Sequence, residues 1–150
     1  MDENNHLKSY KVPNQLFFDI ILEDLKVGKS VKFNVAGNSM LPFLRHGDQV
    51  VIKQPINFNV NIGDIILARY NGRIILHRLI RIDSNHYYLA GDGNLDQVET
   101  IEKADILATV LSGSRGEKPL KINSKINKKL GVCWYYLRPL RYLFSKFKLN

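Results

Sequence analysis

The fold is decided by one stretch, residues 37–52, which reads GNSMLPFLRHGDQVVI. Gly37 permits a backbone turn that a residue with a Cβ atom would resist. Pro42 fixes its own φ and pushes Leu41 toward extended conformations. The stretch therefore predicts a small hydroxyl side chain, Ser39, held where the chain bends out of a strand. Since serine is also common in ordinary β-turns, these residues alone leave open both a nucleophile and a turn residue.

Four further sequence boxes follow this serine in order. The five boxes are Ser39-Met40-x-Pro42, Gly47-Asp48-x-Val50, Gly63-Asp64-Ile65-Ile66, His77-Arg78 and Gly91-Asp92-Gly93-Asn94. The series resembles the signal peptidase I and LexA-type repressor superfamily of serine peptidases, over residues 30–112. Each box carries little information alone, whereas five boxes in order at compatible spacing are specific. The resemblance implies a mainly β, antiparallel fold of the signal peptidase/LexA-like kind.

The hydrophobic pattern before the C-terminal tail independently indicates one helix followed by short antiparallel strands. Apolar residues at helical spacing predict a helix that begins near Asn14 and ends at Gly28. Asn71-Gly72 predicts a type I′ turn between two strands of a hairpin. The predicted strands cover residues 31–35, 48–53, 65–70, 73–82, 86–90 and 107–111.

The C-terminal part of the chain differs in composition from the rest. Residues 1–116 carry 13 basic and 13 acidic side chains, so the net charge of +8 comes from nine basic residues and one acid in residues 117–150. The polar, lysine-rich residues 112–129 read as a linker, and Pro139 interrupts any helix that follows. We therefore expect three parts: an N-terminal segment and amphipathic helix (1–29), a β peptidase domain (30–112), and a linker with a basic aromatic tail (113–150).

The basic tail suggests an anionic partner. Its residues 130–149 interleave Arg and Lys with aromatic side chains that are able to sit among lipid headgroups: Trp134, Tyr135, Tyr136 and Tyr142. This pattern makes the tail a candidate contact for an anionic membrane surface. Docking on the β domain or on a partner protein is the alternative, and nucleic acid is the least favoured partner. Because one helix alone is predicted before the β domain, no helix-turn-helix fits.

The resemblance implies that Ser39 is a nucleophile and that a downstream strand supplies its general base. In this superfamily the base is a lysine in the repressor and bacterial signal peptidase branches, and a histidine in the archaeal and endoplasmic-reticulum branches. No lysine lies between Lys53 and Lys103, whereas the corresponding strand contains His77. We therefore predict the His-type branch, with His77 as general base. Without the flanking match, a histidine packed on a half-buried strand is the simpler interpretation.

A histidine base needs a carboxylate that fixes its tautomer and stabilises the imidazolium. His-type relatives carry acids within and just after a Gly-Asp-Asn-Asn-like motif, to which Asp92 and Asp96 correspond here. One of these two is expected to orient the histidine, and either one alone also fits an acid that caps a tight turn. Oxyanion or substrate contacts are expected from backbone N–H groups near the serine, together with Asn38 and Met40.

Composition limits the class of protein. A chain of 150 residues with 45% hydrophobic and 24% charged residues is ordinary for one soluble globular domain. The single Cys133 excludes an internal disulfide and a four-cysteine zinc site, and we expect no metal and no cofactor. The sequence contains no transmembrane stretch and no secretory signal peptide. We therefore expect a cytoplasmic protein, with peripheral attachment to the cytoplasmic membrane through the tail.

These observations lead to one hypothesis and two alternatives. The hypothesis is a serine endopeptidase that resembles signal peptidase and processes a precursor or leader peptide, so that its partner is a protein or peptide substrate. The first alternative is a non-catalytic peptide- or membrane-binding β domain of the same fold. The second is a self-cleaving regulator, although no obvious site such as Ala-Gly precedes the β domain and Ala36-Gly37 lies at the serine box itself.

Overall fold

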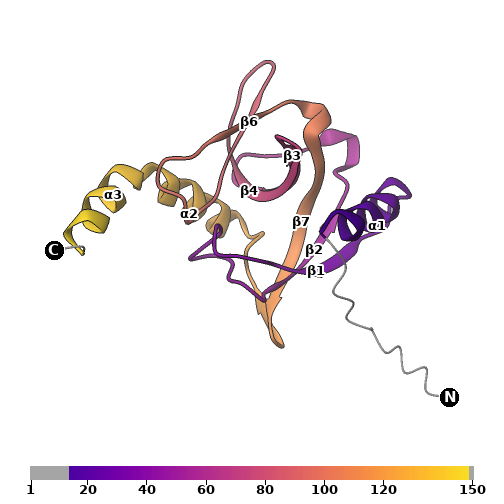
Figure 1. The fold of residues 1–150 in the computed structure, drawn as a ribbon, viewed down its shortest axis with the longest axis horizontal. Helices are drawn as coiled ribbons and strands as arrows, with labels where there is room; N and C mark the ends of the chain where they lie inside the picture. The colour runs from indigo at the N-terminus through magenta and orange to yellow at the C-terminus, as the bar shows by residue number, and fades with distance from the viewer. Residues whose placement is uncertain (1–13, 149–150) are drawn as a thin grey trace.

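The computed structural model describes residues 14–148, which form a curled antiparallel sheet with helices at both ends of the chain (Figure 1). Residues 1–13, for which we predict a loose start, lie outside the described residues. The elements are α1 (Asn14–Lys26), β1 (Val31–Asn34), β2 (Gln49–Lys53), η1 (Ile56–Phe58), β3 (Ile65–Tyr70), β4 (Arg73–Ile82), β5 (Tyr87–Ala90), β6 (Glu99–Ile101), η2 (Lys103–Asp105), β7 (Ile106–Arg115), β8 (Lys118–Leu120), α2 (Lys125–Tyr136) and α3 (Arg138–Phe147).

The sheet has the strand order β1-β2-β7-β3-β4-β5-β6, and β8 pairs with the end of β7. Every pairing is antiparallel, and the predicted mainly β fold is confirmed. Register shifts interrupt the β2–β7, β3–β7 and β4–β5 pairings. Such irregularities bend a strand and increase its twist, which fits the curl of β3 and β4 in Figure 1.

The apolar run of β3 is buried on both faces of the curled sheet. Side chains alternate between faces along a strand, so Ile65 and Leu67 enter one hydrophobic cluster while Ile66 and Ala68 enter the other. All four are at most 3% exposed. Burial on both faces explains why this strand reads as a continuous apolar run rather than as an alternation.

Helix α1 packs its apolar face on the first of these clusters. Ile21 and Leu25 are buried there, with Phe17 packed against the same cluster. The helix ends where the sequence predicts, because Gly28 adopts φ 79° and donates its N–H to the carbonyl of Leu25 at 3.0 Å. The predicted turn at Asn71-Gly72 is also present, with positive φ at both residues.

The C-terminal part is more regular than the linker predicted for residues 112–129. Strand β7 continues to Arg115 and forms a hairpin with β8. Helix α2 follows at once, with Ser124 as N-cap accepting the N–H of Asn127 at 3.2 Å. The polar composition that suggests a linker reflects a solvent-exposed hairpin and a helix start.

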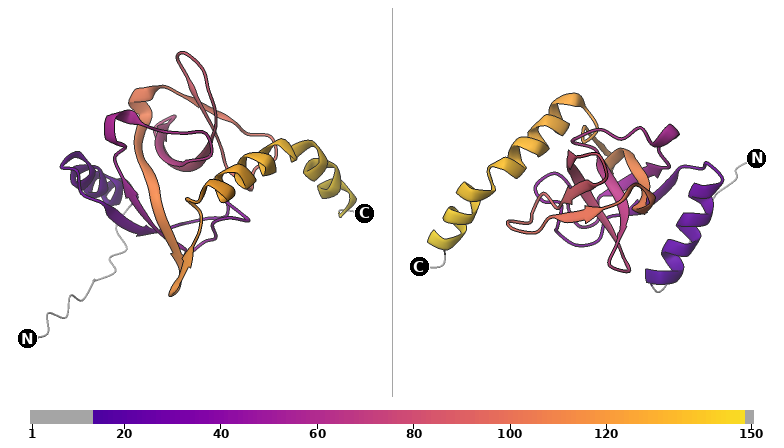
Figure 2. Two further views of the ribbon diagram at one scale, coloured as in Figure 1. Left: turned by 180° about the vertical axis from the view of Figure 1, so that it is seen from behind. Right: turned by 90° about the horizontal axis from the view of Figure 1, so that it is seen from above.

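The two C-terminal helices meet at Leu137, and Pro139 lies in the first turn of α3. A proline is tolerated there because its missing N–H would have no partner within the helix. The prediction that Pro139 interrupts the helix is confirmed. Together α2 and α3 form an arm on the side of the sheet opposite α1 (Figure 2).

Candidate active site

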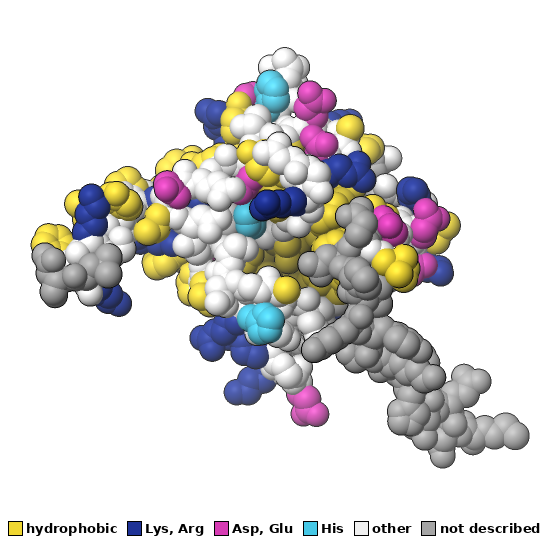
Figure 3. All heavy atoms as spheres, viewed as in Figure 1, with side chains coloured by type: hydrophobic (Ala, Val, Ile, Leu, Met, Phe, Trp, Pro, Cys, Tyr) yellow, Lys and Arg dark blue, Asp and Glu magenta, His cyan; other side chains and the backbone are white. Residues whose placement is uncertain are grey.

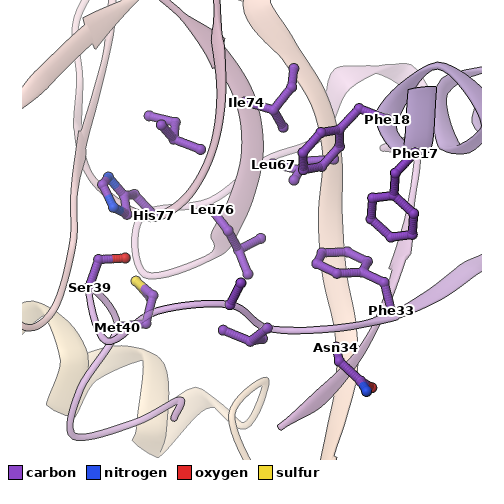
Figure 4. Close-up of a pocket in the computed structure, with 13 residues that line it drawn as sticks. Phe17, Phe18, Phe33, Asn34, Ser39, Met40, Leu67, Ile74, Leu76 and His77 are labelled. Carbon is purple, nitrogen blue, oxygen red and sulfur yellow. The ribbon is translucent and has the colours of Figure 1, made fainter. Parts of the chain in front are cut away.

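Ser39 and His77 line one pocket, of about 310 Å³, between α1, the end of β1 and β4 (Figure 4). In Figure 4 the Ser39 hydroxyl and the His77 imidazole lie next to each other, at the end of the pocket far from Phe17. The other lining residues are mostly apolar: Phe17, Phe18, Phe33, Asn34, Val35, Ala36, Met40, Leu67, Ile74, Ile75 and Leu76. The structure thus brings together the two residues that the sequence pairs as nucleophile and base.

Backbone hydrogen bonds close the loop that carries Ser39. The N–H of Val35 donates to the carbonyl of Asp48 at 2.7 Å, and the N–H of Gly47 donates back to the carbonyl of Val35 at 2.8 Å. Within the loop, Gly37 has φ 81°, a conformation that a side chain with a Cβ atom adopts only with strain. The serine therefore sits in a fixed turn rather than in a loose loop.

The expected oxyanion and substrate residues lie on either side of the serine. Asn38 is exposed, and its carbonyl accepts the N–H of Leu41 at 3.2 Å. The Met40 side chain is 1% exposed and forms part of the pocket wall. In the described part of the chain, the backbone N–H groups of Ser39 and Met40 have no hydrogen-bond acceptor. Two main-chain donors are therefore unoccupied beside the serine hydroxyl.

The buried partner of His77 is Glu99, which lies on β6. Nδ1 of His77 is 2.9 Å from Oε2 of Glu99, and both side chains are buried. Since an ionised carboxylate only accepts hydrogen bonds, a neutral imidazole in this contact carries its proton on Nδ1 and keeps Nε2 as an acceptor. This is the orientation that a general base requires.

Neither expected acid contacts His77. Asp92 is bound by Arg78, whose Nε and Nη2 each donate to one carboxylate oxygen at 2.7 Å, and Asp96 is exposed. Burial raises the pKa of Asp92, and the hydrogen bonds from Arg78 oppose that shift. The structure thus corrects the expected contact: Glu99, and neither Asp92 nor Asp96, is the carboxylate hydrogen-bonded to the His77 ring. The sequence feature that could have indicated Glu99 is the alternation in Glu99-Thr100-Ile101, which places the Glu99 side chain on the same buried face as the apolar Ile101.

The loop after β5 packs directly on Ser39 and borders His77. The N–H of Gly93 donates to the carbonyl of Ser39 at 2.8 Å. A Cβ atom on Gly91 would lie 2.6 Å from the Ser39 carbonyl oxygen and 3.0 Å from Nε2 of His77. Nε2 of His77 and the Ser39 carbonyl therefore both border the space left by the missing side chain of Gly91.

A comparison with protein families identifies the family of the chain. Residues 2–111 match the family model described as Peptidase S24-like. The chain belongs to the peptidase S24-like family. The curled antiparallel sheet is consistent with the fold of this family, and the predicted superfamily is confirmed. No curated protein matches the chain.

Beyond the matched region of this S24-like chain, α3 holds the loop that follows β5. Arg138, 8% exposed, donates to the carbonyl of Gln97 at 2.9 Å and to that of Gly91 at 3.3 Å. Its guanidinium carbon lies 4.5 Å from the ring centroid of Tyr135. Burial lowers the pKa of Arg138, and nearby negative groups that include Glu99 oppose the shift. The arm thus places a positive charge near the acid of the site.

Two more residues of the arm bind the same loop of the S24-like domain. Trp134 Nε1 and Arg141 Nη2 both donate to the carbonyl of Asp92, at 2.9 Å and 2.8 Å. The Arg141 guanidinium lies over the Trp134 ring, 4.1 Å from its centroid. Part of the predicted basic aromatic tail therefore docks within the chain, where the indole N–H of Trp134 is bound to the loop after β5.

Helix α2 also covers the buried ion pair. Arg78 is 1% exposed, donates to the Gly63 carbonyl at 2.8 Å and lies 4.9 Å from the ring centroid of Phe43. A Cβ atom on Gly131 of α2 would lie 2.2 Å from its guanidinium carbon. The helix therefore approaches the Arg78–Asp92 pair closely because residue 131 has no side chain.

Residues 14–148 of the S24-like protein contain no group of three or more His, Cys, Asp or Glu placed to hold a metal ion. The helices among the same residues are all too short or too polar to cross a bilayer.

Proposed function

We propose that this S24-like protein is a serine endopeptidase in which Ser39 is the nucleophile, His77 the general base and Glu99 the acid that orients the base. The observation that carries the proposal is the buried hydrogen bond between His77 Nδ1 and Glu99, 2.9 Å long, which leaves Nε2 beside Gly91 in the space that the Ser39 carbonyl also borders. A nucleophile, a base and a buried acid that orients the base are the three parts of a serine-peptidase triad.

The proposed reaction follows from this arrangement. Nε2 of His77 removes the hydroxyl proton while Oγ of Ser39 attacks the peptide carbonyl carbon. The N–H groups of Ser39 and Met40 are the proposed donors to the oxyanion. His77 then gives its proton to the leaving amine, which breaks the C–N bond and leaves an ester on Ser39. A water molecule, deprotonated by His77, hydrolyses the ester and restores the enzyme.

We propose that the substrate is a peptide bound as an extra strand. Among residues 14–148, residues 73–77 of β4 pair only with β3, because β5 pairs with β4 from Arg78 onward. β1 pairs on one side only, with β2. The pocket lies between these two unpaired edges, among residues 34–36 and 74–77. Such edges accept a peptide backbone, while the apolar lining accepts its side chains.

An apolar lining favours an extended peptide with hydrophobic residues near the cleaved bond, as in a leader or precursor segment. The phenylalanines at the α1 end of the pocket, Phe17, Phe18 and Phe33, form its most apolar wall. A peptide library with cleavage sites read by mass spectrometry tests this preference.

The first experiment is selective labelling of Ser39 by a serine-reactive fluorophosphonate, with the adduct located by mass spectrometry. We expect labelling of the wild type and none in Ser39→Ala or His77→Ala. Ser112→Ala is the matched control, because Ser112 is exposed on β7 and should leave labelling unchanged. Absence of labelling in a folded wild type would favour a non-catalytic peptide-binding domain. Cleavage confined to the chain itself, at a rate independent of protein concentration, would favour a self-cleaving regulator.

A further inference from the structure

One face of α3 is apolar and uncovered. Five side chains lie on it, at 44% to 76% exposure: Leu137, Leu140, Leu143, Phe144 and Phe147. At 3.6 residues per turn they fall within about one third of the helix circumference. We define these five residues as the α3 stripe. Single exposed apolar residues are ordinary, but a continuous stripe on a projecting helix indicates a contact surface.

Positive charges border the α3 stripe. Lys146 in α3 and its C-cap Lys148 are exposed, and among residues 14–148 neither makes an ion pair. Two further exposed lysines, Lys125 and Lys129, lie on the preceding helix α2 and add to the positive charge of the arm. Figure 3 shows hydrophobic and basic side chains side by side along the arm. An apolar stripe flanked by lysines matches a surface with an apolar interior and negative headgroups.

The apolar surface continues from the α3 stripe toward the site. A groove of about 550 Å³ lies between α3 and the loop after β5, and its lining includes Leu140, Phe144, Trp134, Gly93 and Leu95. Gly93 is the residue whose N–H donates to the carbonyl of Ser39. A bilayer that covers the stripe would therefore meet the loop on which the serine turn rests.

We propose that the α3 stripe and its lysines bind the surface of an anionic lipid bilayer, with α3 lying in the plane of the interface. A second copy of the chain is disfavoured because a symmetric contact would bring the lysine-rich arms together. Nucleic acid would use the lysines but would leave the apolar stripe exposed. A bilayer is the partner that uses both features.

The test is co-sedimentation of the full chain with vesicles. Wild type should bind phosphatidylcholine vesicles that contain phosphatidylglycerol. It should bind pure phosphatidylcholine vesicles more weakly, and its binding to the anionic vesicles should weaken at high salt. Phe144→Asp and Phe147→Asp should each weaken binding roughly tenfold or more, since each removes a large apolar side chain from the bilayer. Lys146→Glu combined with Lys148→Glu should reduce binding to anionic vesicles but not to pure phosphatidylcholine.

Ile56→Asp is the matched control, because Ile56 is 75% exposed but lies on η1, away from the arm. It should bind as the wild type does. Ser39→Ala should also bind fully, so that membrane binding is judged separately from the proposed peptidase activity. Three results would overturn the proposal: no binding of wild type to anionic vesicles, full binding by a folded Phe144→Asp protein, or a wild-type dimer that Phe144→Asp dissociates. Binding to duplex DNA in place of vesicles would overturn it as well.

Discussion

Nδ1 of His77 lies 2.9 Å from Oε2 of Glu99, and the two side chains are buried together although their strands, β4 and β6, are separated by β5. The contact holds the imidazole through Nδ1, and Nε2 borders the space beside Gly91 that the Ser39 carbonyl also borders. Glu99 also has one buried oxygen, Oε1, without a hydrogen-bond partner among the described residues. Glu99 is also one of the groups that oppose the lowering of the pKa of Arg138 by burial.

Glu99→Gln should slow the labelling of Ser39 by about 10²- to 10⁴-fold, because an amide no longer enforces the tautomer with a free Nε2. The measurement is the second-order rate of fluorophosphonate labelling, with circular dichroism to establish that the fold is retained. Glu117→Gln is the matched control, since Glu117 is exposed in the β7–β8 turn. The assignment fails if Glu99→Gln reacts at the wild-type rate while Asp96→Asn is inactive.

Arg138→Gln should lower the same labelling rate by roughly 10- to 100-fold, because the loop that rests on Ser39 loses two hydrogen bonds from α3. If a peptide substrate is found, kcat should fall more than KM rises, since Arg138 holds the loop after β5 and does not line the substrate pocket. Lys129→Gln, an exposed change on α2, should leave the rate unchanged. An unaltered rate in a folded Arg138→Gln protein would falsify the role of the arm in positioning.

Gly131→Ala should destabilise the protein, although alanine is the better helix former. The added Cβ would lie 2.2 Å from the guanidinium carbon of Arg78, so the helix must move or the Arg78–Asp92 pair must break. Such overpacking typically costs about 1–3 kcal/mol. Thermal unfolding should therefore give a lower Tm for Gly131→Ala, whereas Cys133→Ala, an exposed change in the same helix, should be neutral or slightly stabilising. A raised Tm for Gly131→Ala would show that α2 does not pack there as described.

Asp83 should contribute a pH-dependent part of the stability. Hydrogen bonds from the Tyr88 hydroxyl and from the N–H groups of Asn85 and His86 lower the pKa of Asp83 from 3.8 to about 2. Because the folded pKa is below the unfolded one, this stabilisation is fully present above the unfolded value of 3.8 and is lost as the pH falls to about 2. The Tm difference between wild type and Asp83→Asn should therefore shrink over that interval.

Tyr88→Phe removes the hydrogen bond that lowers the pKa of Asp83 most. The folded pKa of Asp83 should therefore lie closer to its unfolded value, and the pH range over which the Tm difference changes should become narrower. A Tm difference between wild type and Asp83→Asn that stays constant from pH 4 down to pH 2 would contradict the lowered pKa.

Local sequence determined much of this protein. The apolar run of β3, the Asn71-Gly72 turn and the helix that ends at Gly28 follow from side-chain periodicity and from glycine conformation, which act over a few residues. The ordered boxes likewise predicted the superfamily and placed Ser39 and His77 at one pocket. These features need no knowledge of distant contacts.

Tertiary structure decided which carboxylate meets the base and where the tail goes. Asp92 and Glu99 are both buried acids near one loop. The pairing of β5 with β6 sets Leu89 opposite Glu99, and Glu99 contacts His77. Asp92 is bound instead by Arg78. Packing likewise gives the residues of the basic tail two different environments. Arg138 and Arg141 donate hydrogen bonds to carbonyls of the loop after β5, whereas the α3 stripe is exposed to solvent. Composition cannot separate these roles, because the direction of each side chain is set by contacts between segments far apart in the chain.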